Sequence, residues 1–215
     1  LSLTLFGEFC MFLPREKSLF VLVCVNLVLG VSLLLSTRAV ADIIPYTPED
    51  ISQGSLQLMF ELQEYLKEIS GMDHVSLQPA AGAHGEFAGV LMIRAYLKAQ
   101  GNPRKKILLP DSAHGTNPAS STLCGYSVVQ LPSDVEGLID IDKLKALMDE
   151  DTAAIMLTNP NTLGMFEKNI LEITDIVHKK GGLVYCDGAN LNAIMGKCKM
   201  KDMGIDVLHI NLHKT

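Results

Sequence analysis

Five short runs of small and ionisable residues are the candidates for chemistry in this chain. They are QPAAGAHGE at 78–86, DSAHGTN at 111–117, TNPNT at 158–162, DGAN at 187–190 and HINLHK at 209–214. Loops that combine small and ionisable residues are typical of places where a scaffold presents a binding or catalytic site. If all five lie on one edge of one sheet, they form one pocket.

The first run carries the segment Gly82-Ala83-His84-Gly85, which opens a predicted helix. The N–H groups and the dipole at a helix start favour an anion, most naturally a phosphate. The spacing is not that of a nucleoside-triphosphate loop, G-x-x-x-x-G-K-[ST], which disfavours that ligand. A glycine-rich turn before a helix is also, by itself, often only a turn.

Two further residues give the phosphate interpretation a possible chemistry. Asp187 ends an apolar strand without an adjacent cation, so it either caps the next loop or meets a buried positive ligand. Lys214 follows a strand expected at the centre of the sheet, and it is either a surface lysine or a desolvated, nucleophilic amine. A phosphate cradle, an aspartate and a lysine are together what pyridoxal 5'-phosphate needs: an anchor, a partner for the ring nitrogen and an amine.

Other polar residues in these runs have two interpretations each. His114, between Ala and Gly, either stacks on the cofactor ring or bonds loop backbone. Asn159 and Thr162 either bond the cofactor's ring hydroxyl or the substrate carboxylate, or only shape a proline-containing turn. Proton transfer has three candidates, which are His84, Glu86 and His213. No metal site is expected, because only His209 and His213 have the i, i+4 spacing of a helical zinc site, and a strand would place them far apart on one face.

Helix and strand patterns alternate along the part of the chain that carries these runs. Helices are predicted at 47–70, 85–100, 140–149 and 170–180, and strands at 107–109, 126–131, 153–157, 183–186 and 207–212. This alternation predicts an α/β fold in which helices cover both faces of a mainly parallel sheet. Ligands of such sheets bind beyond the carboxyl ends of the strands, where the five runs fall.

Composition excludes several classes of protein. The 215 residues carry a net charge of −6 without a basic block, so a nucleic acid is not an expected partner. The five cysteines contain no C-x-x-C pair, which favours reduced thiols over a disulfide framework or a zinc ribbon.

Residues 1–41 differ from the rest and are expected to be separate from a domain at 42–215. Residues 18–37 carry no charge and follow Arg15 and Lys17, and the small residues Ala39-Val40-Ala41 come after them. An export signal or membrane anchor, a foreign or mistranslated start, and a buried core helix all fit this pattern. A membrane is an expected partner only if residues 18–37 are a true anchor.

The five runs, read with their flanking residues, resemble the glycine decarboxylase P-protein, in particular the form whose catalytic half is a separate second subunit. The resemblance extends from about Ile44 to the last residue. It implies the large domain of a fold-type I transferase dependent on pyridoxal phosphate, with Lys214 as the Schiff-base lysine, Asp187 at the ring nitrogen and His114 stacked on the ring. Further cofactor contacts are expected from Gly82, Ala83, His84, Ala189, Asn159 and Thr162.

The same resemblance implies an activity and its partners. Glycine would lose CO2, and its aminomethyl group would pass to the lipoyl arm of the H-protein carrier. A first P-protein subunit, a second copy of this chain, or both would complete the assembly, in the bacterial cytoplasm or else the mitochondrial matrix. In the family the lysine motif continues into a glycine-rich loop and a smaller domain. Since the chain stops at Thr215 and residues 1–41 do not match, an incomplete piece with little turnover is expected.

Two other functions compete with this one. The first is another fold-type I enzyme, such as a cysteine desulfurase-like lyase, which would need a cysteine on a mobile loop. The second is a membrane-tethered scaffold domain without activity, or an exported form of it.

Overall fold

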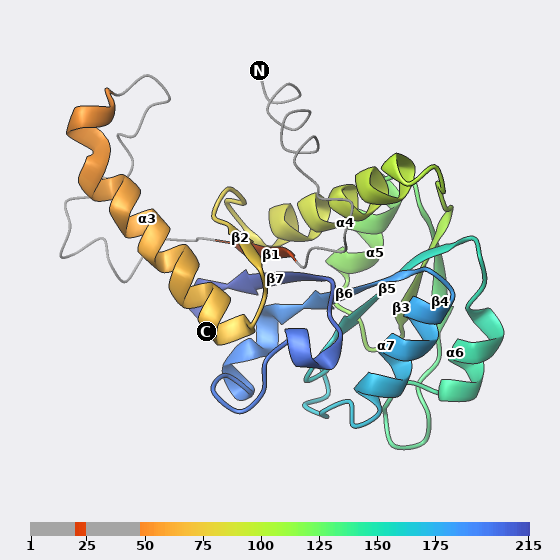
Figure 1. The fold of residues 1–215 in the computed structure, drawn as a ribbon. Helices are drawn as coiled ribbons and strands as arrows, with labels where there is room; N and C mark the ends of the chain where they lie inside the picture. Colours follow the sequence, from red (N-terminus) through yellow and green to blue (C-terminus); the bar gives the residue numbers. More distant parts are fainter. Residues whose placement is uncertain (1–19, 25–47) are drawn as a thin grey trace.

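A seven-stranded sheet forms the centre of the computed structural model, which describes residues 20–24 and 48–215. Its strand order is β2-β1-β7-β6-β5-β3-β4, and every neighbouring pair is parallel (Figure 1). The strands are β1 (Phe20–Cys24), β2 (His74–Ser76), β3 (Lys106–Pro110), β4 (Ser127–Leu131), β5 (Thr152–Thr158), β6 (Leu183–Asp187) and β7 (Val207–Asn211). The predicted parallel sheet is confirmed, and β7 lies inside it rather than at an edge.

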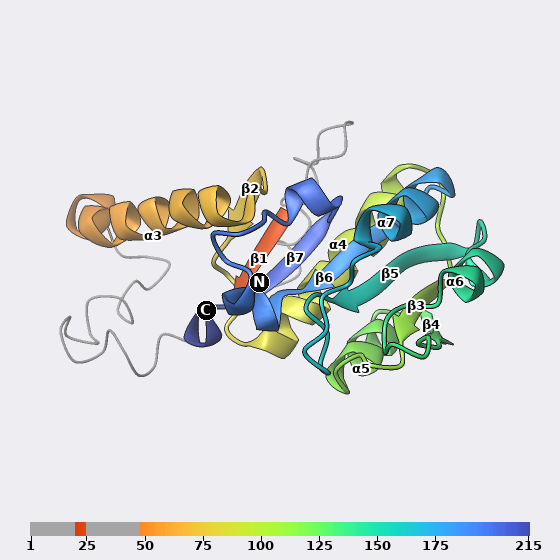
Figure 2. The ribbon, with the colours of Figure 1, turned by 90° about the horizontal axis from the view of Figure 1, so that it is seen from below.

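Helices cover both faces of this sheet, as predicted. Helices α4 (Gly82–Ala99) and α5 (Thr116–Leu123) lie on one face, and α6 (Ile141–Leu147) and α7 (Ile170–Lys179) lie on the other (Figures 1 and 2). The long helix α3 (Glu49–Ser70) lies beside the β2 edge of the sheet, and the short 3-10 helices are η1 (Gly188–Ala193), η2 (Lys201–Met203) and η3 (Leu212–Lys214).

Successive side chains of a strand point to opposite faces of the sheet, so the buried side chains divide between two apolar cores. In β5, Ala154 and Met156 pack in the core under α4, whereas Ile155 and Leu157 pack in the core under α7. Strand β6 alternates in the same way, with Tyr185 on the α4 face. This alternation decides which polar side chains at the strand ends share a face.

Three elements differ from the sequence predictions, and one of them is strand β2, which lies where no strand was predicted. Residues 116–123 were expected to be a loop and instead form α5, whose proline, Pro118, lies in the first turn, where a missing N–H costs little. Five residues of the segment 1–41, Phe20–Cys24, form β1, which pairs in parallel with both β2 and β7. The other residues of that segment lie outside the described residues, so its interpretations stay predictions. Among the helices of the described ranges, none is long and apolar enough to cross a membrane.

Gly188 marks the closest approach between the end of β6 and β7. A Cβ atom built on Gly188 would lie 2.2 Å from the backbone oxygen of His209, which cannot move without distorting β7.

We therefore expect Gly188→Ala to lower the free energy of unfolding by about 3 kcal/mol, measured by urea unfolding followed by circular dichroism. The matched control is Gly54→Ala in α3, where nothing lies within 4 Å of the added atom. That change should raise stability by about 0.5–1 kcal/mol, because alanine favours a helix. Equal stabilities of Gly188→Ala and the unchanged chain would contradict this packing.

Candidate functional site

The register of three adjacent strands brings three polar side chains into one row. Thr158 at the end of β5 pairs with Asp187 at the end of β6, and Asp187 pairs with His209 on β7. All three lie on the α4 face, because each is two residues after a side chain of that core. All three are buried.

The carboxylate of Asp187 is only 3% exposed and is held by neutral donors. Its Oδ1 accepts a hydrogen bond from the Ala189 N–H at 3.0 Å and lies 3.1 Å from Nε2 of His209, while Oδ2 lies 3.4 Å from Nδ2 of Asn117. Within the described ranges, no lysine or arginine pairs with it. A buried carboxylate without a cation is costly, so this environment favours a positive group beside Asp187.

The ring of His209 has both nitrogens engaged. Nε2 donates to Asp187, and Nδ1 lies 2.8 Å from the Tyr185 hydroxyl, which must therefore be the donor of that bond. Burial lowers the pKa of His209, and the positive charge of Lys214 lowers it further, although the carboxylates of Asp187 and Glu86 oppose both effects. The imidazole is therefore neutral, with its proton on Nε2.

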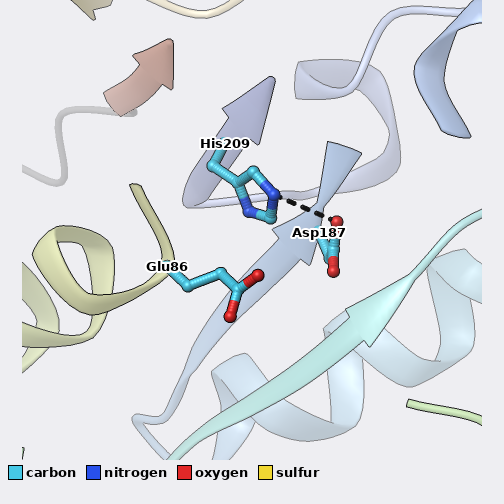
Figure 3. A group of neighbouring side chains, drawn as sticks. All are labelled: Glu86, Asp187 and His209. Carbon is cyan, nitrogen blue, oxygen red and sulfur yellow. Dashed lines mark ion pairs between the residues drawn. The ribbon is translucent and has the colours of Figure 1, made fainter. Parts of the chain in front are cut away.

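Glu86 adds a second buried carboxylate to the group, from α4. It is 4% exposed, and it accepts hydrogen bonds from the hydroxyls of Thr116 at 2.9 Å and Ser120 at 3.4 Å. Figure 3 shows Glu86, Asp187 and His209 converging, and one ligand atom from each lies within 4.8 Å of the others. Two carboxylates around a neutral imidazole create a site that attracts one cationic group.

Lys214 lies in η3, directly after β7, and η3 packs against η1, which begins directly after Asp187. Its ammonium group is close enough to His209 to affect the titration of that ring. The sequence prediction required the amine and the carboxylate to meet at one edge of the sheet. The structure brings them to the carboxyl ends of adjacent strands, but Lys214 is exposed, so of the two sequence interpretations it shows the surface lysine and not the desolvated amine.

The other predicted residues are distributed around this edge. His114 bonds Thr116 through Nδ1 at 2.7 Å. The Thr162 hydroxyl donates to the backbone oxygen of Ser112 at 2.6 Å, and this bond joins the loops after β5 and β3. Nδ1 of His84 accepts a hydrogen bond from the Ala80 N–H at 3.1 Å. Gly82 and Ala83 begin α4, whose first turn has no side-chain cap and no acidic residue.

Asn159 is not brought to this group. Its Oδ1 accepts a hydrogen bond from the Glu167 N–H at 3.0 Å, and its Nδ2 contacts the Met203 sulfur at 3.7 Å, in the core under α7. Thr158, one residue earlier, lies on the α4 face instead.

Sequence reasoning missed five residues of the site, which are Tyr185, Thr158, Asn117, Asn211 and His209, the last considered only as a metal ligand. Three of them carry a buried oxygen without a hydrogen-bond partner in the described part of the chain: Asn117 Oδ1, Thr158 Oγ1 and Asn211 Oδ1. Asn211 also lies against the start of α4, since its Nδ2 is 3.0 Å from the position of a Cβ on Gly82. Tyr185 could have been selected from the sequence, because it lies two residues before Asp187 on the same predicted strand and therefore shares its face.

Comparison with known proteins places this chain in a family. A parallel sheet covered on both faces, with an aspartate and a lysine at the ends of adjacent strands, defines a fold-type I transferase domain. The sequence profile of the class-V aminotransferases matches residues 83–215, which is more than half of the chain, and the chain belongs to that family.

The curated relatives agree with the resemblance noted from the sequence. The chain is 61% identical over 171 residues to the probable glycine dehydrogenase (decarboxylating) subunit 2 of Chloroherpeton thalassium, covering 80% of this chain and 35% of that protein. It is 58% identical over 175 residues to the protein of the same name from Thermotoga petrophila, covering 81% and 37%. The chain thus spans little more than a third of the length of these relatives.

Solved structures confirm the fold. A NifS-like protein matches 84% of this chain and 52% of its own, with a TM-score of 0.58 and 16% identity. Oryza sativa TDC, solved with PLP and tryptamine, matches 65% of this chain and 34% of its own, with a TM-score of 0.53 and 14% identity. Both share the fold-type I architecture with this chain.

The neutral state of His209 predicts how stability depends on pH. The unfolded chain binds a proton at this residue near pH 6.5, whereas the folded chain resists it, so stability should fall as pH drops below about 6.5. Between about pH 6.5 and the pKa of His209 in the folded chain, this one group should lower the free energy of unfolding by up to about 1.4 kcal/mol for each pH unit.

Urea unfolding between pH 7.5 and 5 should show a shallower pH dependence in His209→Gln than in the unchanged chain. His213→Gln removes an exposed imidazole from the same strand end and is the control. The same slope in His209→Gln and the unchanged chain would show that His209 does not resist protonation.

Proposed function

We propose that this chain is the cofactor-binding part of a glycine dehydrogenase (decarboxylating) that uses pyridoxal 5'-phosphate. The observation that carries the proposal is the buried Asp187 carboxylate without a cationic side chain, at the same sheet edge as Lys214. Both residues belong to runs within the region shared, at 56–61% identity, with proteins named glycine dehydrogenase (decarboxylating) subunit 2.

The residues at this edge fit a pyridoxal phosphate. Asp187 would pair with the protonated ring nitrogen, the positive partner that it lacks, and the amine of Lys214 would bind the aldehyde carbon. The start of α4, where the N-cap residue Ala81 makes no side-chain capping bond and the first turn holds no acidic residue, suits the phosphate. The unpartnered oxygens of Asn117, Thr158 and Asn211 leave hydrogen-bonding capacity beside it.

Bound here, the cofactor supplies an electron-accepting ring for the carbon that loses its carboxyl group. The chain's own residues make that ring effective. Asp187 holds the proton on the ring nitrogen, and the neutral His209, fixed by Tyr185, donates to Asp187 without competing as a cation. His114, from the loop after β3, would cover the ring face.

Substrate and partners follow from the same proposal. Glycine would lose CO2, and its aminomethyl group would pass to a lipoyl arm on the H-protein, whose disulfide takes up the two electrons. The relatives are named as a second subunit, and this supports a partner subunit for the present chain. That partner is a first P-protein subunit, a second copy of this chain, or both.

The described cysteines give no support to a desulfurase-like alternative. Burial raises the pKa of the Cys124 thiol to about 11 and that of Cys186 to about 12. Burial also raises the pKa of Cys198. A thiol that acts as a nucleophile needs the opposite shift.

Added pyridoxal phosphate should bind the chain covalently, with a shift of the cofactor's absorption band to longer wavelength that survives dialysis. Lys214→Ala should abolish the shift, because it removes the amine. Asp187→Asn should weaken cofactor binding at least tenfold, about 1.4 kcal/mol, because it removes the charge opposite the ring nitrogen. Lys143→Ala, an exposed lysine on α6, is the control. Failure of the unchanged chain to take up the cofactor, or equal uptake by Lys214→Ala, would refute the proposal.

A further inference from the structure

Glu86 is a buried carboxylate for which the proposed chemistry has no stated role. Among the residues that the structure describes, no lysine or arginine forms an ion pair with it, and the hydroxyls of Thr116 and Ser120 donate hydrogen bonds to it. A carboxylate kept in such a place is costly, which points to a task for its charge.

Thr116 connects Glu86 to His114. Its hydroxyl lies 2.9 Å from Oε1 of Glu86 and 2.7 Å from Nδ1 of His114. A hydroxyl has one proton to donate, and a carboxylate can only accept, so the proton points to Glu86. The Thr116 oxygen must then accept a proton from the His114 ring. Nδ1 of His114 is therefore the protonated nitrogen.

One contact favours the other tautomer. The backbone N–H of Thr116 lies 3.3 Å from the same Nδ1, and it would donate to that nitrogen if the nitrogen were unprotonated. This bond is longer than the 2.7 Å contact with the hydroxyl. The shorter contact decides the tautomer, because the Thr116 hydroxyl that accepts from His114 also donates to the carboxylate of Glu86, and this strengthens both hydrogen bonds.

We propose that Glu86 and Thr116 are positioning residues that hold neutral His114 as its Nδ1–H tautomer and leave Nε2 with a free lone pair. In the described part of the chain, the hydrogen bonds of the His114 ring are all at Nδ1, so Nε2 is available to a ligand. Glu86 acts on His114 through Thr116, which is 30 residues away from Glu86 in the sequence. This hydrogen bond therefore links α4 to the start of α5, next to the loop that carries His114.

The consequence for the reaction rests on the proposed function. An amino-acid substrate arrives with a protonated amino group, which must lose a proton before its nitrogen bonds a carbonyl carbon. An unprotonated Nε2 on the ring that covers the site can take up that proton, so that the imidazole becomes a cation.

The test is a two-bond proton–nitrogen NMR spectrum of the uniformly 15N-labelled 215-residue chain, without cofactor, at about pH 8, where imidazoles are neutral. His114→Gln assigns the His114 signals. We expect the pattern of an Nδ1–H ring in the unchanged chain. Thr116→Val removes the hydroxyl and leaves only the backbone N–H at Nδ1, so the pattern should switch to Nε2–H.

Three variants make the result specific. Thr116→Ser keeps a hydroxyl and should retain the Nδ1–H pattern. Glu86→Met removes the acceptor, frees the Thr116 proton to donate to His114, and should give Nε2–H with Thr116 still present. Ser120→Ala removes the other hydroxyl on Glu86 without touching His114 and should leave Nδ1–H unchanged. If Glu86→Met does not fold, the valine and serine variants at Thr116 still decide the outcome.

An Nε2–H ring in the unchanged chain, or an Nδ1–H ring in Thr116→Val, overturns the proposal. Pyridoxal phosphate binding then tests the proposed function separately. A chain with the Nδ1–H pattern that takes up no cofactor contradicts the cofactor assignment and leaves the positioning of His114 intact. A chain that takes up the cofactor but shows an Nε2–H ring contradicts the positioning of His114 and leaves the cofactor assignment intact.

Discussion

A carboxylate buried at the end of a central strand is the constraint on which the rest of the site depends. Asp187 has lost nearly all contact with water, and the chain offers it hydrogen bonds from His209, Asn117 and Ala189 instead of a positive charge. Neutral donors satisfy its lone pairs without cancelling its charge. The fold therefore keeps a negative potential at this edge, which a cationic ligand can use.

The surrounding residues preserve that potential. Burial and the positive charge of Lys214 lower the pKa of His209, and the Tyr185 hydroxyl bonds its Nδ1, so the ring beside Asp187 orients the carboxylate and does not neutralise it. Glu86 adds a second negative group from α4, and Lys214 carries a positive charge in η3, directly after β7. The arrangement suits a ligand with a protonated ring nitrogen and an aldehyde within reach of one amine.

Much of the fold and part of this site could be predicted from the sequence. Alternating helix and strand patterns gave the parallel sheet, and strand ends gave Asp187 and Lys214, because both signals are local. Helix α5 was missed since Thr116, Asn117 and Pro118 have low helix propensity, and only packing on the sheet stabilises them. The sequence prediction chose Asn159 for the site, whereas Thr158 is the residue on the α4 face. Which of the two faces α4 depends on the tertiary structure.

The contacts among Tyr185, His209 and Glu86 could not be predicted in the same way. They depend on the register between β6 and β7 and on how α4 lies over the sheet, and these are tertiary properties. The sequence places these residues up to 123 positions apart, as the numbers of Glu86 and His209 show. No periodicity links positions so distant.

The most direct measurement is the protonation state of the ring nitrogen in pyridoxal phosphate labelled with 15N at that atom and bound to this chain. The 15N chemical shift should be that of a protonated pyridine well above the pH at which the free cofactor loses its proton, and it should move to the unprotonated value in Asp187→Asn. An unprotonated ring nitrogen in the unchanged chain, or one that Asp187→Asn leaves unaffected, would contradict the role assigned to the buried carboxylate.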